Sequence, residues 1–287
     1  MKQNCDVCKS KNQKVDFSLK DYNVIKCENC GLRYIDQDSL KLKPEQLYSQ
    51  DYFTKQHIQF FSDYNDIMSN KMTKKLQNFR KRLIRLKELG AKGRLLDVGC
   101  GQGTFLYLAK KENFKPFGCD ISEYSKTFVE EKFNIPVYNM ELYRLPKNKK
   151  FDVVTMLDFF EHTTDPNAVL DAAKNLLNKN GLLLIQTPNG KSLLHNLANL
   201  IYKLSFGLIK NPTKEVFHMY HNYHFTKRNM EQLLKERSFE ILDYKQDSLP
   251  IHTVEGNFVK KGLLALLYFI SALINKQIDM VFIAKKI

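Results

Sequence analysis

Hydrophobic and polar positions alternate along the second two-thirds of the chain in the manner of an α/β protein. Short apolar runs that fit strands lie near 94–98, 116–120, 136–139, 151–157 and 181–187. Segments with a helical repeat fill the gaps near 103–112, 122–132 and 165–178. Strands that alternate with helices predict right-handed crossovers and a parallel sheet.

The pattern then changes after the fifth strand. Residues 190–210 are mostly apolar and predict a helical insertion, so we expect 190–225 to form a substrate lid. Thr226 is a typical N-cap for a helix over 227–237. Two further strands are expected at 239–246 and 279–285.

An amphipathic helix is expected ahead of this alternating region. Its apolar face repeats at spacings of three and four through Met68, Met72, Leu76, Phe79, Leu83 and Leu86. Its other face carries Lys71, Lys74, Lys75, Arg80, Lys81, Arg82 and Arg85. That face is either a surface for RNA or an acidic substrate, or the solvated side of a helix that covers a ligand pocket, and we favour the second.

The longest uncharged run covers 262–275, between Lys261 and Lys276. It is too short for a transmembrane span, which needs about 20 residues. We expect a helix packed on the core. The flanking lysines leave peripheral contact with a membrane as the alternative.

Four cysteines near the N-terminus form two C-x-x-C pairs: Cys5, Cys8, Cys27 and Cys30. Their spacing is typical of a structural zinc site with four thiolate ligands, and 22–25 is expected to form a strand that leads into the second pair. So small a unit needs the metal to fold. Disulfides are less expected, because no secretion signal is present and the motif favours a reducing, cytoplasmic location. Cys100 and Cys119 are expected to be small residues at strand ends rather than ligands.

A glycine-rich turn follows the first expected strand of the alternating region. Asp97 stands two residues before Gly99, and Gly101 and Gly103 lead into the helical segment. Glycines there let the backbone turn tightly and approach a ligand. Asp120 ends the next strand, where an acid typically meets ribose hydroxyls. The third glycine comes too early for the dinucleotide loop G-x-G-x-x-G, and an acid beside a loop without Lys or Arg suits a cationic ligand.

With its leading acid, this loop resembles the motif D-x-G-x-G-x-G of class I S-adenosylmethionine (SAM) methyltransferases. Residues 151–162, 180–189 and 221–226 resemble, in that order, the family's fourth strand, fifth strand and a late His-x-Tyr-x-Phe-Thr stretch. The resemblance covers 93–287 and implies a Rossmann-like seven-stranded methyltransferase sheet with the last two strands as an antiparallel hairpin at its edge. A generic Rossmann protein with another nucleotide is the alternative.

The predicted organisation therefore has three parts: a zinc ribbon over 1–36, a linker and amphipathic helix over 37–92, and a SAM-binding domain over 93–287. The resemblance also implies a cofactor site. In it, Asp97 and the three glycines face the methionine part, Asp120 binds the ribose, and Ile121 lies against the adenine. Met140 and Glu141 contact the adenine edge, and Asp158 borders the methionine amine.

The loop after the fourth expected strand carries the candidate chemistry for the methyl acceptor. Asp158, Glu161 and His162 form a D-x-x-E-H cluster that resembles the E-x-x-E-H of ubiquinone-pathway O-methyltransferases, where such side chains are associated with a divalent cation. A weakly held Mg²⁺ is one interpretation. The favoured one is general-base catalysis, with His162 and His221 as the catalytic candidates in one pocket. His195, His218 and His224 are expected to be ordinary exposed or core-edge histidines.

The amino-acid composition helps to decide between a small molecule, a nucleic acid and a membrane as the partner. The formal net charge is +14, which is compatible with a nucleic-acid or membrane partner. Only eight of the 45 basic residues are Arg, however, and a nucleic-acid reader is expected to use more. Neither the N-P-P-Y motif nor the Pro-Cys pair of nucleobase methyltransferases is present.

We therefore expect a SAM-dependent methyltransferase that acts on a small molecule, such as a sugar or a precursor of a surface polysaccharide or natural product. An RNA methyltransferase is the first alternative. A non-catalytic SAM-binding or zinc-mediated interaction protein is the second.

Overall fold

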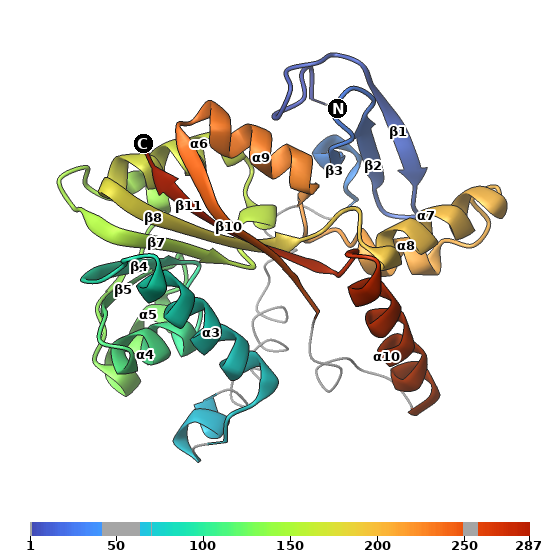
Figure 1. Ribbon diagram of the computed structural model, residues 1–287. Helices are drawn as coiled ribbons and strands as arrows, with labels where there is room; N and C mark the ends of the chain where they lie inside the picture. Colours follow the sequence, from blue (N-terminus) through green and yellow to red (C-terminus); the bar gives the residue numbers. More distant parts are fainter. Residues whose placement is uncertain (1, 42–63, 70, 249–257) are drawn as a thin grey trace.

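A seven-stranded sheet forms the centre of the computed structural model, which describes residues 2–41, 64–69, 71–248 and 258–287 (Figure 1). Its strands in chain order are β4 (Arg94–Val98), β5 (Lys115–Cys119), β6 (Val137–Tyr138), β7 (Phe151–Leu157), β8 (Leu177–Pro188), β10 (Phe239–Asp247) and β11 (Asp279–Lys286). The expected strands are therefore all present. The fifth one is longer than predicted, because the chain turns from helix to extended backbone at Leu177.

The strands follow the order β10-β11-β8-β7-β4-β5-β6. The five from β8 to β6 are mutually parallel, and β11 runs antiparallel to both β8 and β10. The Rossmann-like methyltransferase sheet and its antiparallel edge are thus confirmed. After β4 the chain first builds β5 and β6 on one side and then β7 and β8 on the other. In such sheets ligands bind beyond the carboxyl ends of the strands at this switch point, here between β4 and β7.

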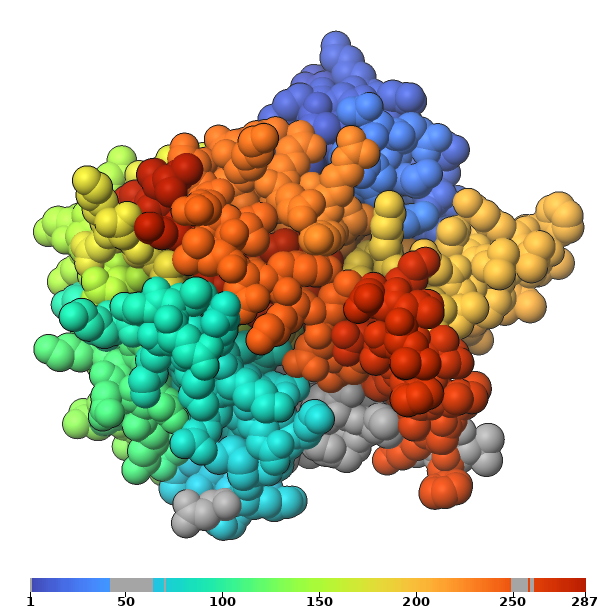
Figure 2. Space-filling model, in the orientation of Figure 1, coloured from blue at the N-terminus to red at the C-terminus, as the bar shows by residue number. Residues whose placement is uncertain are grey.

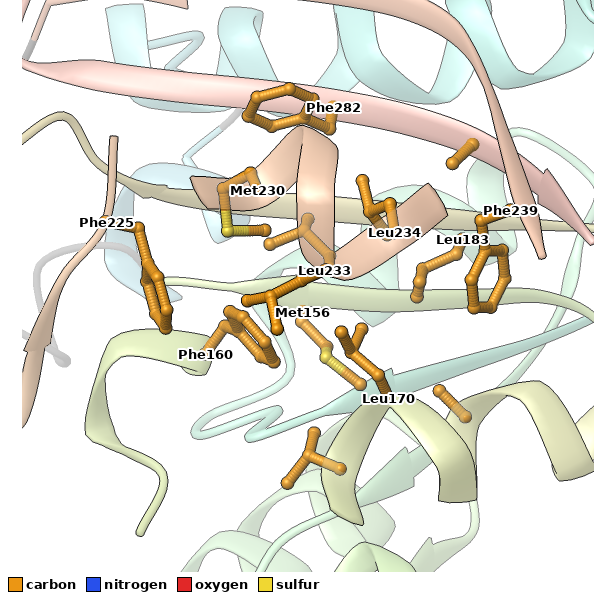
Figure 3. Packing of buried hydrophobic residues seen from close by; sticks show 14 of the residues in the cluster. Met156, Phe160, Leu170, Leu183, Phe225, Met230, Leu233, Leu234, Phe239 and Phe282 are labelled. Atoms are coloured by element: carbon orange, nitrogen blue, oxygen red, sulfur yellow. The ribbon is translucent and has the colours of Figure 1, made fainter. Parts of the chain in front are cut away.

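Helices cover both faces of the sheet (Figure 1). The helices on one side are α3 (Lys74–Glu88), α4 (Thr104–Lys111) and α5 (Glu123–Phe133). On the other side lie α6 (Pro166–Leu176) and α9 (Lys227–Glu236), whose apolar residues pack with Met156 and Phe282 of the sheet (Figure 3). Thr226 caps α9 as predicted, in a reciprocal capping box with Asn229.

The N-terminal segment forms a second, smaller sheet in the order β1-β2-β3-β9. Its first three strands are β1 (Gln13–Ser18), β2 (Asn23–Cys27) and β3 (Arg33–Ile35), and the fourth is β9 (Tyr223–His224) from the distant C-terminal half. The sequence pattern did not predict this pairing, since two residues carry no periodicity. One continuous core joins Cys5, Ile25 and Tyr34 with Met156 and Phe225, so the ribbon is fused to the large domain.

The predicted amphipathic helix is present but starts later than expected. Thr73 caps α3, so Met68 and Met72 lie outside it and are exposed, while Leu83 and Leu86 are buried as predicted. Arg82 was placed on the solvated face and is instead buried, near Asp247 at 3.4 Å. Other basic residues of α3 also pair with acids: Arg80 with Glu112, Lys87 with Glu112 and Arg85 with Asp243.

The insertion after β8 is helical, as predicted. It consists of α7 (Leu193–Leu204) and α8 (Asn211–Val216). The uncharged run near the C-terminus lies in α10 (Phe258–Leu273), which packs beside α7 (Figure 1). Among the described residues, no helix combines the length and the apolar character needed to cross a membrane.

Candidate active site

The glycine loop forms the floor of the candidate site at the end of β4. Gly99, Gly101 and Gly103 have φ values of 69°, 50° and 71°, which side chains with a Cβ rarely adopt. A Cβ on Gly99 would lie 2.6 Å from a ring carbon of Phe159, so this glycine also lets the loop after β7 pack against the loop after β4. The neighbourhood of Gly101 is open, with nothing within 4 Å of such a Cβ.

Asp120 ties the loop to the end of β5. One carboxylate oxygen accepts a hydrogen bond from the Gly101 N–H and the other accepts one from the Ser122 N–H, both at 2.9 Å. Burial raises the pKa of Asp120, and these backbone donors oppose that shift. Each oxygen keeps one lone pair, which matches the two hydroxyls of a ribose.

Asp97 is buried within the sheet end and accepts a hydrogen bond of 2.6 Å from the Thr155 hydroxyl. Burial raises the pKa of Asp97 to about 7. Gln102 is also buried, yet neither its amide oxygen nor its amide nitrogen has a hydrogen-bond partner among the described residues. Unpartnered polar atoms in a glycine loop fit a site built for a polar cofactor. Sequence reasoning missed Gln102, whose only signal is a polar side chain between two glycines.

The other predicted cofactor contacts surround the loop. Ile121 is 70% exposed beside Asp120, which leaves its side chain free to cover a flat ring. Met140 is partly buried, and its carbonyl accepts a hydrogen bond from the Cys119 thiol at 3.2 Å. Glu141 pairs with Arg144 and keeps its side chain 39% exposed. Their positions are compatible with the adenine contacts expected of them, and those contacts remain predictions.

Asp158 begins the loop after β7 with a φ of 52°, a strained value for a residue with a Cβ. Gln186 of β8 donates a hydrogen bond of 2.8 Å to its carboxylate. Asp158 also raises the pKa of Glu161 and of Asp279, on top of the larger effect of burial. Carboxyl groups thus gather at the carboxyl ends of β4, β5, β7 and β8, which suits a cationic ligand.

Glu161, His162 and His221 come together, and their ligating atoms all lie within 4.8 Å of one another. Glu161 is 1% exposed; one of its oxygens accepts from the Thr187 hydroxyl at 3.0 Å, and the other has no hydrogen-bond partner among the described residues. That free oxygen lies 4.0 Å from Nε2 of His162 and 3.9 Å from Nε2 of His221. The two imidazole rings are 4.8 Å apart in an edge-to-face arrangement. His162 and His221 thus lie side by side, and the pocket that they are expected to share beside the cofactor stays a prediction.

The second nitrogen of His162 is fixed by the backbone. Its Nδ1 lies 2.6 Å from the Tyr220 carbonyl oxygen, which can only accept, so Nδ1 carries the proton and Nε2 is left with a lone pair. Burial lowers the pKa of both His162 and His221 and raises that of Glu161. The group therefore favours neutral imidazoles at neutral pH.

Three further histidines extend this group into the interior. The His218 ring lies 3.8 Å from that of His221, and His224 lies 6.0 Å from His221 and 5.8 Å from His195. His224 has no hydrogen-bond partner for either nitrogen among the described residues. Sequence reasoning treated these three as ordinary histidines, because only the fold brings α7 and β9 together.

This arrangement changes the expected metal site. The Mg²⁺ interpretation used Asp158, Glu161 and His162, whereas the structure joins Glu161 with two imidazoles. One carboxylate and two histidines form a ligand set that suits a transition metal better than Mg²⁺.

The four N-terminal cysteines converge on one point. Sγ of Cys5 lies 3.6 Å from that of Cys30, and Sγ of Cys8 lies 3.5 Å from that of Cys27. Those separations are far longer than the about 2.05 Å of a disulfide and close to the about 3.8 Å edge of a tetrahedral zinc–thiolate site. The four cysteines fit a zinc ribbon. Cys100 and Cys119 are buried elsewhere, as predicted.

Comparisons with known sequences show what the chain is similar to. A family model described as a methyltransferase domain matches residues 64–244. The ubiquinone biosynthesis O-methyltransferase of Neisseria meningitidis serogroup C is 32% identical over 124 residues, which cover 39% of this chain and 52% of that protein. The enzyme of the same name from Coxiella burnetii is 27% identical over 157 residues, which cover 50% and 66%. The chain spans about half the length of the curated relatives it matches.

Solved structures share the fold. Magnesium protoporphyrin IX methyltransferase from Synechocystis PCC 6803, with bound S-adenosylhomocysteine, aligns with a TM-score of 0.52 at 16% identity and covers 74% of this chain and 83% of that one. A SAM-dependent methyltransferase from Thermotoga maritima aligns with a TM-score of 0.52 at 18% identity and covers 82% and 97%.

Proposed function

Because this chain belongs to the SAM-dependent class I methyltransferases, we propose that it transfers a methyl group from SAM to a hydroxyl of a small polar molecule, such as a sugar or a related precursor. The observation that supports this proposal is the unpartnered, buried oxygen of Glu161 between Nε2 of His162 and Nε2 of His221. A buried acceptor without a partner is costly unless a ligand satisfies it. A hydroxyl placed among these three atoms can donate its hydrogen bond to one of them.

The proposed cofactor site uses the residues expected from the sequence, with Gln102 added. Asp97, the glycine loop and Gln102 would hold the methionine part, and Asp120 would bind both ribose hydroxyls. Ile121, Met140 and Glu141 would enclose the adenine, and Asp158 would border the amine and the transferring methyl. When bound, SAM supplies an activated methyl group on a sulfonium, so the protein mostly has to align the reacting atoms.

The chemical step left to the protein is removal of the proton from the acceptor hydroxyl. We assign His221 as the base: its Nε2 takes the proton while the acceptor oxygen forms its bond to the methyl carbon and the carbon–sulfur bond breaks. Glu161, whose oxygen lies 3.9 Å from this Nε2, would stabilise the protonated imidazole, and His162, held by the Tyr220 carbonyl, would position the acceptor. The name O-methyltransferase carried by the curated relatives agrees with an oxygen acceptor.

The zinc ribbon would support this base from the side. β3 pairs with β9, which begins two residues after His221. The Ile35 N–H donates to the Asn222 carbonyl at 2.9 Å, and the Asn222 side chain donates to the carbonyl of His162 at 2.7 Å. A zinc ion on the four cysteines would therefore fix both histidine segments through β2 and β3.

The proposal is tested by incubating the enzyme with methyl-labelled SAM and an extract of small metabolites, and by searching for products that gain the label. His221→Ala should lower turnover by about 10²–10⁴-fold, the usual contribution of a general base. Its affinity for S-adenosylhomocysteine should stay near that of the wild type.

His218→Ala is the matched control, because it removes a neighbouring buried imidazole but leaves the trio of Glu161, His162 and His221 intact. Full turnover by His221→Ala would overturn the assignment of the base. Label in RNA rather than in small molecules would overturn the acceptor class. Loss of turnover on chelation while the ribbon keeps its zinc would assign the trio to a metal instead.

A further inference from the structure

One face of the molecule exposes far more apolar side chain than its fold requires. On α7 and the turn that follows it, Leu204 is 71% exposed, Phe206 94% and Leu208 85%. On α10, Leu266, Phe269 and Leu273 are 54%, 63% and 68% exposed. Large apolar side chains exposed in such number indicate a surface that binds something. We call these six residues, with Ile209 and Leu263, the apolar face.

Helix α10 exposes the apolar side that a surface helix normally buries. Among its described side chains it buries only Tyr268 and Ser271, while Leu263, Leu266, Phe269 and Leu273 point away from the protein. Their spacing of three and four places them on one side of the helix. A globular helix normally buries such a side. The sequence predicted a helix packed on the core, and the structure corrects that orientation.

The two helices that carry the face meet at one end. The Leu193 N–H at the start of α7 donates to the Lys276 carbonyl just after α10, at 2.8 Å. In Figure 2 the golden-yellow α7 and α8 segment and the red α10 lie on the same side of the molecule. Chain segments about 60 residues apart, counting from Phe206 to Leu266, thus carry exposed apolar side chains on two helices that diverge from one junction.

The segments that carry the face are rich in lysine. Residues 191–214 contain four lysines and no acid, and 258–278 contain three lysines and no acid. Lys203, Lys210 and Lys276 are exposed beside the apolar side chains. A second copy of this chain would bring like charges together if it docked through the same face. An anionic lipid surface satisfies both features, since lysines meet headgroups and apolar side chains enter the acyl boundary.

We infer that the apolar face docks the protein on the surface of an anionic lipid bilayer. The described helices are too short or too polar to span it, so α10 and the α7–α8 turn lie in the interface. The inference does not depend on methyl transfer, because docking is measured on the protein without cofactor or acceptor. It does place the bilayer beside the histidine group, since α8 leads directly into Phe217 and His218.

Co-sedimentation with vesicles tests the inference. The protein should bind vesicles of phosphatidylcholine mixed with phosphatidylglycerol, bind vesicles of phosphatidylcholine alone much less, and dissociate as salt is raised. Phe206→Ser combined with Leu208→Ser should lower the partition coefficient at least about tenfold, because it removes two of the most exposed apolar side chains. Leu266→Ser combined with Phe269→Ser should do the same from the other part of the face.

Ile287→Ser is the matched control, because Ile287 is 68% exposed outside the apolar face. The control should keep the wild-type partition coefficient, and melting curves should show that all variants remain folded. Equal partition of every variant, or no binding to anionic vesicles at low salt, would overturn the inference. A dimer in sedimentation velocity that disappears in the Phe206 and Leu208 variant would overturn it in favour of self-association.

Discussion

Replacing Asp120 tests how the chain holds its cofactor. In the structure the Asp120 carboxylate accepts one hydrogen bond per oxygen from the backbone, at 2.9 Å to Gly101 and 2.9 Å to Ser122. The remaining lone pairs are available for two ribose hydroxyls. Hydrogen bonds to a charged group contribute about 1.5–3 kcal/mol each, and water replaces part of that in the variant. Asp120→Ala should therefore weaken binding by about 1–3 kcal/mol, or about 5- to 150-fold in Kd.

Isothermal titration with S-adenosylhomocysteine measures this change, and the ligand-induced rise in Tm should shrink with it. Asp120→Asn preserves shape but turns an amide N–H towards one of the two backbone donors, so it should lose nearly as much affinity. Glu123→Gln is the control, because Glu123 is a nearby acid whose side chain is 69% exposed at the start of α5. An unchanged Kd for Asp120→Ala, or a preference of the wild type for NAD, would refute the reasoning.

Two further predictions concern pH and zinc. Burial raises the pKa of Asp97 to about 7, so the carboxyl is neutral below that pH and charged above it. The affinity for the cationic cofactor should therefore fall as the pH drops from about 8 to about 6, by up to about tenfold per pH unit. Titration calorimetry across this pH range should show the change in affinity. Asp97→Asn should remove it, except for the part that comes from the titration of the ligand's own amine. An identical pH profile for the variant would contradict the prediction. Purified protein should contain about one zinc per chain. Removal of the zinc should lower Tm and turnover, because β3 of the ribbon holds the segment after His221. The cofactor affinity should change little, because β4, β5 and Asp120 hold the glycine loop. A metal-free native protein, or full turnover after zinc removal, would contradict it.

The sequence carried the parts of the fold that are encoded locally. Apolar runs of four to seven residues and glycines at fixed offsets predicted the strands from β4 to β8, the loop after Asp97 and the acid at Asp120. The Thr226 cap is likewise a local signal, and the structure confirms it.

What the sequence could not provide depends on contacts between distant segments. The pairing of β3 with β9 involves two residues on β9, which is too short for any periodic signal. The burial of Arg82 depends on Asp247, which lies 165 residues further along the chain. The outward orientation of α10 has the same origin, because a helical repeat defines a face but not the side of the helix that meets the protein.

The candidate site likewise contains residues that local motifs predict and residues that only the structure brings together. The glycine loop and Asp158 follow from motifs. The grouping of His162 with His221 was expected because the loop after the fourth strand and the segment after the lid meet at the carboxyl edge of such a sheet. The role of Glu161 as the centre of that group, and the row of His218, His224 and His195 behind it, required the coordinates. These residues come from the loop after β7, from α7 and from the segment around β9, which have no relation in the sequence.

A crystal structure of the enzyme with bound S-adenosylhomocysteine tests the central claim most directly. We predict the ligand beyond the carboxyl ends of β4 and β7, with its ribose on Asp120. We also predict that the sulfur faces a pocket lined by Glu161, His162 and His221. A ligand bound in that place with the three side chains turned into a separate cavity would contradict the proposed base, and a ligand bound elsewhere on the sheet would contradict the account of the cofactor site.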